Sequence, residues 1–315
     1  MKTTIISLLT SFTVIIATLL SSCVQDLDGG KEQQVISDEM ALVTLSLSAP
    51  SSPVTRAEAT ATENAISEVD VMLFDATSDK FIYRAHGTQI ENQATVPTVD
   101  PDPYATKKFE ARLPLGGPYK VVVLANARTA IAGLTPKLPI ASLDEDENRS
   151  REAVLNSIVA SMPAGKTNFP MWGYLPANVT ISPTGNSNLP DIDLTRAVAR
   201  VDVSLNDTIT NFVLTSARLY NYHDKGHVAP EAVAGGYNLA PYPVAGSKQA
   251  EGTYISYTTS TSSFANDIYV FEGEESKPVT GSEWKANTCL VVGGLYDDRV
   301  NTPYPTYYRV EFYID

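Results

Sequence analysis

Two histidines and an aspartate in the stretch NYHDKGHVAP have the residue types and spacing closest to a metal site. In a helix, His223 and His227 would place both imidazoles on one face, with Asp224 beside them as a third ligand or as a support for a ligand. Gly226 and Pro230 favour a turn over a helix, so this geometry is not expected. The sequence therefore predicts a solvated loop here, with a metal site as the alternative.

Groups for other kinds of catalysis are not evident in the sequence. The motifs of serine hydrolases, zinc proteases and dinucleotide-binding folds do not occur, and Ala164-Gly165-Lys166 lacks the upstream glycine of a phosphate loop. His86, the third histidine, stands apart from the other two. The many carboxylates are typical of the solvated surface of an acidic protein. We expect no catalytic residue, no cofactor and no metal.

Cys23 can undergo a different chemistry, the attachment of lipid. Residues 1–22 carry one lysine near the start, then an apolar run with small residues before the cysteine, which is the pattern of an export signal. The run Leu20-Ser21-Ser22-Cys23 resembles a lipobox, in which the cysteine thiol is diacylated and the cysteine becomes the new N-terminus. The alternatives are a short transmembrane helix, for which the apolar run is short, and an ordinary signal peptide.

The second cysteine, Cys289 in NTCLVVGGL, lies in a segment that is typical of a buried strand. With Cys23 acylated, no disulfide can form within the chain, so the cores of the exported protein must supply its stability. We expect Cys289 to be a small core side chain rather than a nucleophile.

Arg56 is a single basic residue in the polar stretch SSPVTRAEAT, which has the look of a protease cleavage site. It follows LVTLSLSAP, where Val43, Leu45 and Leu47 alternate with polar residues at the period of a half-buried strand. The polar, glycine-containing residues 24–41 before that strand suit a tether between lipid and domain. A strand joined to the rest by a cleavable loop is one interpretation; an ordinary exposed loop arginine is the other.

Composition limits the class of protein. The chain has 315 residues, 43% of them hydrophobic, which allows one large domain or two ordinary ones, and we expect two. The net charge of -13 and the pI near 4.7 argue against nucleic-acid binding, because contact with phosphates requires a concentrated basic face.

The elements that must position these residues are mainly strands. Short runs of alternating or continuous apolar residues recur between clusters of Gly, Pro, Asn and Asp. The expected strands are 42–48, 67–74, 119–127, 199–205, 212–222, 267–273, 288–296 and 307–314.

One helix is expected among these strands. The segment 144–161 opens with acidic residues and places Val154, Leu155, Ile158 and Val159 on one helical face. Such a helix would lie against the end or the flank of a sheet.

A composition shift at 180–193, where Pro, Gly, Asn and Ser replace apolar residues, marks the expected domain boundary. Short strands on both sides of it, with little helix between them, are typical of antiparallel sandwiches rather than of a parallel α/β sheet. The fold expected is mostly β, with two antiparallel β-sandwich domains in tandem and one flanking helix.

Tyrosine is frequent, with 16 residues, and combines a flat apolar face with a hydroxyl group. Strand propensity explains most of them, and a sugar or protein contact in the loops at 230–262 is the alternative. The clusters are Tyr237, Tyr242, Tyr254 and Tyr257, then Tyr304, Tyr307, Tyr308 and Tyr313.

Several of these segments together carry a family resemblance. They are the Cys23 lipobox, VTRAEA around Arg56, VDVMLFD, YKVVVLANA, FPMWGYLP, LTRAVARVDV and FVLTSARLYNYHDKGHVAP, and they span nearly the whole exported chain. In their order and spacing they resemble the Bacteroidia-type fimbrillins, the subunits of type V pili.

The resemblance implies a fold and a maturation path. It implies two β-sandwich domains of transthyretin-like topology, export as a lipoprotein, and cutting at the cell surface by an arginine-specific protease of the gingipain kind. On this chain the cut bond is Arg56–Ala57, and the displaced strand, 42–48, carries Val43, Leu45 and Leu47. The implied divisions are a signal peptide at 1–22, a lipid-linked propeptide at 23–56, an N-terminal sandwich at 57–188 and a C-terminal sandwich at 189–315.

Loss of that strand would expose a hydrophobic groove and unpaired strand edges, which only another strand can fill. A strand from a neighbouring subunit would fill it, and because donor and acceptor surfaces differ, the contact would be head-to-tail and would generate a filament. The expected function is thus a pilin that supports adhesion on the outer surface, with other pilin subunits and the protease as partners, and host or bacterial surfaces as further ligands of the fibre.

Two other functions stay open at this point. A surface glycan-binding lipoprotein would use the tyrosine-rich loops, and an exported hydrolase would need a catalytic group that the sequence does not offer. Family members also continue past a strand like YYRVEFYI into a donor segment, whereas this chain stops at Asp315. We expect either a truncated sequence or a subunit that accepts a strand without giving one.

Overall fold

The computed structural model describes the part of the chain that the following ranges cover: 40–49, 60–90, 106–134, 149–183, 188–233, 236–238, 249–250, 252–259, 263–271 and 287–312.

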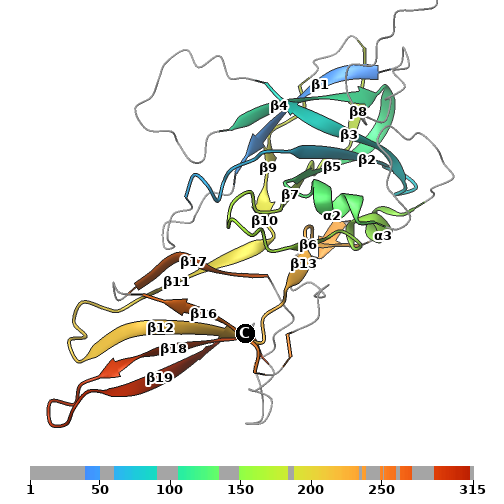
Figure 1. Cartoon of the computed structure of the whole chain (residues 1–315). Coiled ribbons are helices and arrows are strands. Elements are labelled where there is room, and N and C mark those ends of the chain that lie inside the picture. Colours follow the sequence, from blue (N-terminus) through green and yellow to red (C-terminus); the bar gives the residue numbers. More distant parts are fainter. Residues whose placement is uncertain are drawn as a thin grey trace, which may run out of the picture. The chain divides into compact units, whose positions relative to one another are not determined.

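Within these ranges the chain is mostly β, as expected (Figure 1). The largest sheet has the order β10-β7-β5-β2-β3-β4-β1-β9, and β8 pairs with β5 outside this path. Its strands are β1 (Met40–Ser48), β2 (Val69–Asp75), β3 (Phe81–Gln89), β4 (Lys107–Pro114), β5 (Gly116–Ala125), β7 (Met171–Tyr174), β8 (Val179–Ile181), β9 (Ile192–Asp193) and β10 (Thr195–Arg196).

This sheet encloses its own core, because β1, β4 and β9 face β2, β5 and β7 across one cluster of buried side chains. Alternate residues supply the cluster from each strand, such as Val71 and Leu73 of β2 and Phe109 and Ala111 of β4. The strand β3 belongs to both halves, since it pairs with β2 along most of its length and with β4 at its end.

The outer face of β2 and β5 is also covered, which explains why these strands have nearly continuous apolar sequences. Met72 and Val122 pack there against residues of two short helices, α2 (Arg128–Ala132) and α3 (Arg151–Leu155). The strands β6 (Val159–Ser161) and β13 (Lys225–His227) pair with each other, and β14 (Glu231–Val233) pairs with β15 (Gly236–Asn238).

The expected helix at 144–161 is shorter than predicted. It begins after Ser150, whose side chain accepts a hydrogen bond from the Ala153 N–H, and the helix ends at Leu155. Ile158 is buried, but Val159 already belongs to β6, so the apolar run combines the end of a helix with the start of a strand. Residues 144–148 lie outside the described residues.

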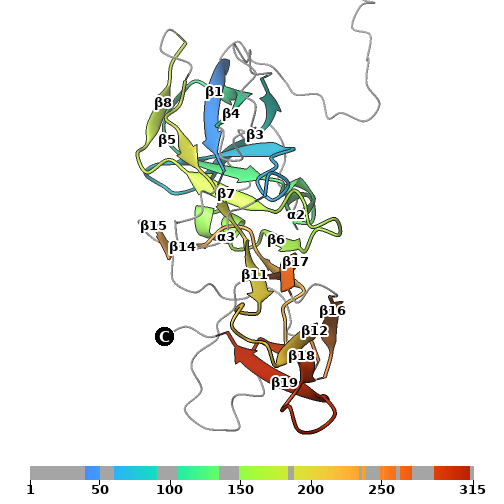
Figure 2. The same ribbon diagram turned by 90° about the vertical axis from the view of Figure 1, so that its left-hand side faces the viewer.

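Two further sheets form the second core. One pairs β11 (Val198–Ser204) with β17 (Ser263–Phe271), and the other has the order β16-β12-β18-β19, with β16 (Tyr254–Thr258), β12 (Phe212–Tyr220), β18 (Cys289–Tyr296) and β19 (Tyr304–Glu311). Leu214, Leu219, Phe264 and Ile268 are among the side chains buried between them. The two sheets thus pack as a second sandwich, with β18 and β19 side by side (Figure 2).

The strands predicted from alternation are therefore confirmed, and the mostly β architecture with it. The boundary expected near 188 stays a prediction. The structure adds that β9 and β10, which follow it, pair with β1 and β7 of the first sheet, and that the next strand, β11, pairs with β17.

Candidate functional site

The strand β1 lies between two partners in the first sheet, and both views show it beside β4 (Figures 1 and 2). It runs antiparallel to β4 from the pair Met40↔Pro114 to the pair Leu47↔Lys107. On its other edge it is parallel to β9 through Leu47↔Ile192. This position in the sheet is the candidate functional site, and we call it the β1 slot.

The inward side chains of β1 are fully enclosed. Val43 is 2% exposed, and Leu45 and Leu47 are 0% exposed. All three belong to the core cluster that β2, β4 and β5 share, whereas Leu42 on the opposite face is 48% exposed. Burial of an aliphatic side chain stabilises by about 1.5 to 3 kcal/mol, so the three together contribute roughly 5 to 9 kcal/mol to the retention of β1.

Backbone hydrogen bonds also hold β1 on the side away from β4. The Leu189 N–H donates to the Thr44 carbonyl at 2.9 Å, and the Leu194 N–H donates to the Ser48 carbonyl at 2.9 Å. If β1 left, the facing groups of β4 and of the 189–194 segment would lose their partners, and a buried group without a partner is costly. A strand of matching alternation can satisfy both the core and the backbone groups.

The predicted site residues fall into two sets. Val43, Leu45 and Leu47 are brought together on the inner face of β1, as alternation predicted. Cys23, Arg56 and Ala57 lie outside the described residues, so lipid attachment and cleavage stay predictions.

The stretch with the paired histidines was predicted to be a solvated loop, and this prediction is wrong from Lys225 onward. Lys225–His227 forms β13, paired with β6, and Val228 and Ala229 after it are buried. Burial lowers the pKa of the His227 imidazole, with the Glu231 carboxylate acting in the opposite direction. No group of three His, Cys, Asp or Glu side chains that could hold a metal occurs among the described residues.

The third histidine, His86, belongs to an ion cluster around Asp70 that no sequence pattern indicated. The Arg84 Nε donates to the Asp70 Oδ1 at 2.9 Å, the Arg128 Nε donates to Oδ2 at 3.2 Å, and the His86 Nε2 lies 3.3 Å from Oδ1. Burial lowers the pKa of His86; Asp70 opposes this shift, and the two arginines add to it. The cluster joins β2, β3 and α2, so we assign it a structural role.

Some of the tyrosine side chains pack against other residues, and others are exposed to solvent. Tyr237 packs against Trp172 and Tyr174 at ring-centroid distances of 5.1 and 4.6 Å, and the Arg151 guanidinium lies 4.7 Å from its ring centre. Tyr237, for which a contact in the loops at 230–262 was the alternative, is therefore partly buried against the cluster on the outer face of β2 and β5. Those of β19 are exposed, whereas Tyr242 and Tyr313 lie outside the described residues.

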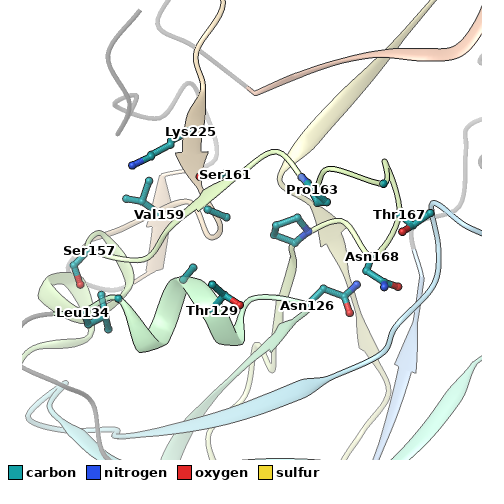
Figure 3. A pocket seen from close by; sticks show the side chains of 15 residues that line it. Asn126, Thr129, Leu134, Ser157, Val159, Ser161, Pro163, Thr167, Asn168 and Lys225 are labelled. Carbon is teal, nitrogen blue, oxygen red and sulfur yellow. The ribbon is translucent and has the colours of Figure 1, made fainter.

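A groove of about 930 Å³ lies beside the first core (Figure 3). The side chains of Asn126 and Thr129 lie on one side of it, with Ser161 and Lys225 on the other. Among the described residues, its lining includes no His, Cys, Asp or Glu, and Lys225 is its one charged side chain. Cys289 is buried in β18, in agreement with the core role expected of it.

Among the described residues, no helix is both long and apolar enough to cross a membrane.

Comparison with known proteins finds similar solved structures and a matching family model. A search of curated proteins finds no match. Among solved structures, the chain is similar to a candidate cell adhesion protein of Parabacteroides distasonis, at 12% identity and a TM-score of 0.49 over 87% of this chain and 84% of that chain. It is also similar to a fimbrial assembly protein of the same organism, at 16% identity and a TM-score of 0.45 over 86% of each chain.

The family model of the major fimbrial subunit protein (FimA) matches residues 41–231, more than half of the chain. The match begins inside β1 and continues through the rest of the first core into the second group of strands. It confirms the resemblance drawn from the sequence segments, and the family is structural rather than enzymatic. The chain thus belongs to the family of the major fimbrial subunit protein, whose members build cell-surface fimbriae.

Proposed function

We propose that this chain is a pilin that is exported as a lipoprotein on Cys23, is cut between Arg56 and Ala57, and then polymerises by strand complementation in the β1 slot. The observation that carries the proposal is the enclosure of β1, whose inward side chains Val43, Leu45 and Leu47 are almost completely buried. Their removal would create a groove of defined length and register for one extended strand.

Cleavage in this scheme acts by changing an intramolecular contact into an intermolecular one. While the chain is intact, β1 is covalently linked to the rest of the subunit, so its return to the slot is an intramolecular event. After the cut, the propeptide 23–56 is a separate chain, and once it dissociates its concentration near the slot falls. A donor strand then competes with it as one separate chain with another, so the protease controls strand exchange without contributing to the final interface.

The geometry of the exchange favours a fibre over a closed dimer. The slot is an acceptor surface on the first sandwich, and the donor strand must come from a different surface of the next subunit. A contact between two different surfaces is heterologous and propagates head-to-tail. We propose adhesion as a property of the fibre, with other pilin subunits as the direct partners.

The test is polymerisation of the purified precursor after treatment with an arginine-specific protease. Wild-type protein should yield a product that begins at Ala57 and forms a ladder of oligomers in gel filtration and electrophoresis. Arg56→Ala should stay uncut at this bond and monomeric. Arg299→Ala, which removes an exposed loop arginine, is the matched control and should behave as wild type. Oligomers of Arg56→Ala in wild-type yield would overturn the proposal.

A further inference from the structure

The first described residues after the expected cleavage bond form a reciprocal capping box. The Thr60 N–H donates to the Glu63 Oε2 at 2.5 Å, and the Glu63 N–H donates to the Thr60 Oγ1 at 3.3 Å. The Asn64 N–H closes the turn on the Thr60 carbonyl at 3.1 Å. This is the pairing that Thr-x-x-Glu favours at the start of a helical turn. The turn Thr60–Asn64 is therefore locally ordered.

Glu63 is buried, with 1% of its side chain exposed, and it is neutralised by two arginines. The Arg200 Nη1 donates to Oε2 at 2.6 Å, and the Arg196 Nη1 lies 3.3 Å from Oε1 as an ion pair. The arginine side chains are 10% and 17% exposed, so these pairs are shielded from water. Burial, together with Glu63 beside it, raises the pKa of the Tyr269 hydroxyl to about 12. A shielded pair of this kind is costly to break from one side.

The backbone that follows the turn is held as well. The Asn126 side chain donates to the Ala65 carbonyl at 2.8 Å and accepts from the Ser67 N–H at 2.9 Å. Ile66 between them is buried in the first core. The chain is thus fixed from Thr60 up to the start of β2.

One short segment of the chain contacts both sides of the expected cut. Ile192–Leu194 binds the end of β1, through the β9 pairing and the hydrogen bond to Ser48. Arg196 and Arg200, a few residues later, bind Glu63 on the other side of the cut. The two contacts differ in kind, because β1 is held by ladder bonds that another strand can replace, whereas Glu63 is held by ion pairs specific to its carboxylate.

We propose that Glu63, Arg196 and Arg200 form a retention anchor, which holds residues 60–66 on the body of the protein while the segment before the cut leaves. The anchor rests on the proposed function and adds a boundary to it. The strand β1 is replaced by the donor strand, whereas the chain from Thr60 onward keeps its place. In sequence, the proposed mature N-terminus then precedes the anchored residues directly.

Hydrogen exchange of the full chain, followed by mass spectrometry, tests the anchor. In uncut wild type, the peptide 60–66 should be protected. Glu63→Gln should raise its exchange rate about tenfold or more, because the two ion pairs lose their charge while the side chain keeps its shape. Asp202→Asn is the matched control, since Asp202 binds the Nε and Nη2 of Arg200 rather than the Nη1 that donates to Glu63, and it should leave 60–66 within about twofold of wild type.

The same measurement after cleavage and release of β1 tests retention itself. The β4 peptide 107–114 should lose protection, while the peptide 60–66 keeps its wild-type rate within about threefold. Equal loss of protection in both peptides would overturn the proposal, as would a Glu63→Gln rate at 60–66 within twofold of wild type. If Glu63→Gln is insoluble, Arg200→Gln serves in its place, with the same outcomes.

The failure of the anchor can be distinguished from the failure of the proposed function. The exchange rates of uncut wild type, Glu63→Gln and Asp202→Asn do not depend on cleavage or on polymerisation. If the cleaved chain polymerises but loses protection at 60–66, the proposed function is supported and the anchor is rejected. If the chain is not cut at Arg56 but Glu63→Gln still raises the exchange rate at 60–66, the ion cluster is supported as a structural contact and its part in maturation is rejected.

Discussion

β1 and β19 are the first and the last described strands. The sequence of β1 alternates and that of β19 is rich in tyrosine, and the two strands have very different surroundings. β1 is paired on both edges, and its inward side chains are 0 to 2% exposed. Within the described residues β19 pairs only with β18, and four of its large side chains are 45 to 58% exposed. These four are Tyr304, Tyr307, Tyr308 and Val310.

The difference shows that the energetic role of a strand depends on what faces it. The inner face of β1 is buried in the first core, whereas, among the described residues, the second core cluster, which β11, β12, β17 and β18 supply, includes no residue of β19. Loss of β1 therefore exposes a core, and loss of side chains from β19 exposes little that is not already in water. Three substitutions can test this contrast, in order of decreasing effect.

The largest effect is expected for Leu45→Ala in β1. It should lower the free energy of unfolding by about 3 kcal/mol, because it removes a side chain from a fully packed site and leaves a cavity. Urea unfolding, followed through the fluorescence of buried Trp172 in β7, measures it. Leu42→Ala, on the exposed face of the same strand, is the control and should cost less than about 1 kcal/mol. Equal losses for both variants would show that β1 is not anchored by its inner face.

A smaller loss, about 2 kcal/mol, is expected for Gly294→Ala in β18, the strand beside β19. A Cβ at this position would overlap the Val213 carbonyl oxygen and the Phe212 ring, so the β12–β18 pairing would have to shift. Thermal unfolding by circular dichroism measures the loss. An unchanged melting temperature would mean that this sheet is looser than its backbone contacts indicate.

The smallest effect is expected for Tyr307→Ala in β19, less than about 1 kcal/mol, since this side chain is more than half exposed. Differential scanning calorimetry beside the Leu45→Ala variant gives the comparison directly. A loss as large as that of Leu45→Ala would show that β19 contributes more to stability than its exposure indicates, and it would remove the contrast.

Alternation identified β1 and β12 correctly, because each has one face on a core and the other toward water. It did not identify β3, where the buried Arg84 and the partly exposed His86 interrupt the apolar sequence. Arg84 pairs with Asp70 of the neighbouring strand, which also lies beside His86, and sequence spacing does not show such a partner. Nor did alternation separate α3 from β6, because Ile158 and Val159 continue one apolar run across the change of element.

Part of the candidate site could be predicted from the sequence. The inward residues Val43, Leu45 and Leu47 followed from period two alone, but the pairing of β1 with β9 joins segments far apart in the chain. The capping box at Thr60 and Glu63 is a local signal that the sequence does contain, although it was not among the predicted features. Its anchoring by Arg196 and Arg200 is a tertiary contact, and only the structure shows it.

The proposal that β1 is a replaceable occupant of its slot is tested most directly by the N-terminal sequence of the subunit extracted from assembled fibres. We expect a mature chain that starts at Ala57, with no peptide from 40–48 in the fibre fraction. A fibre subunit that starts at Cys23 and still contains β1 would disprove the exchange.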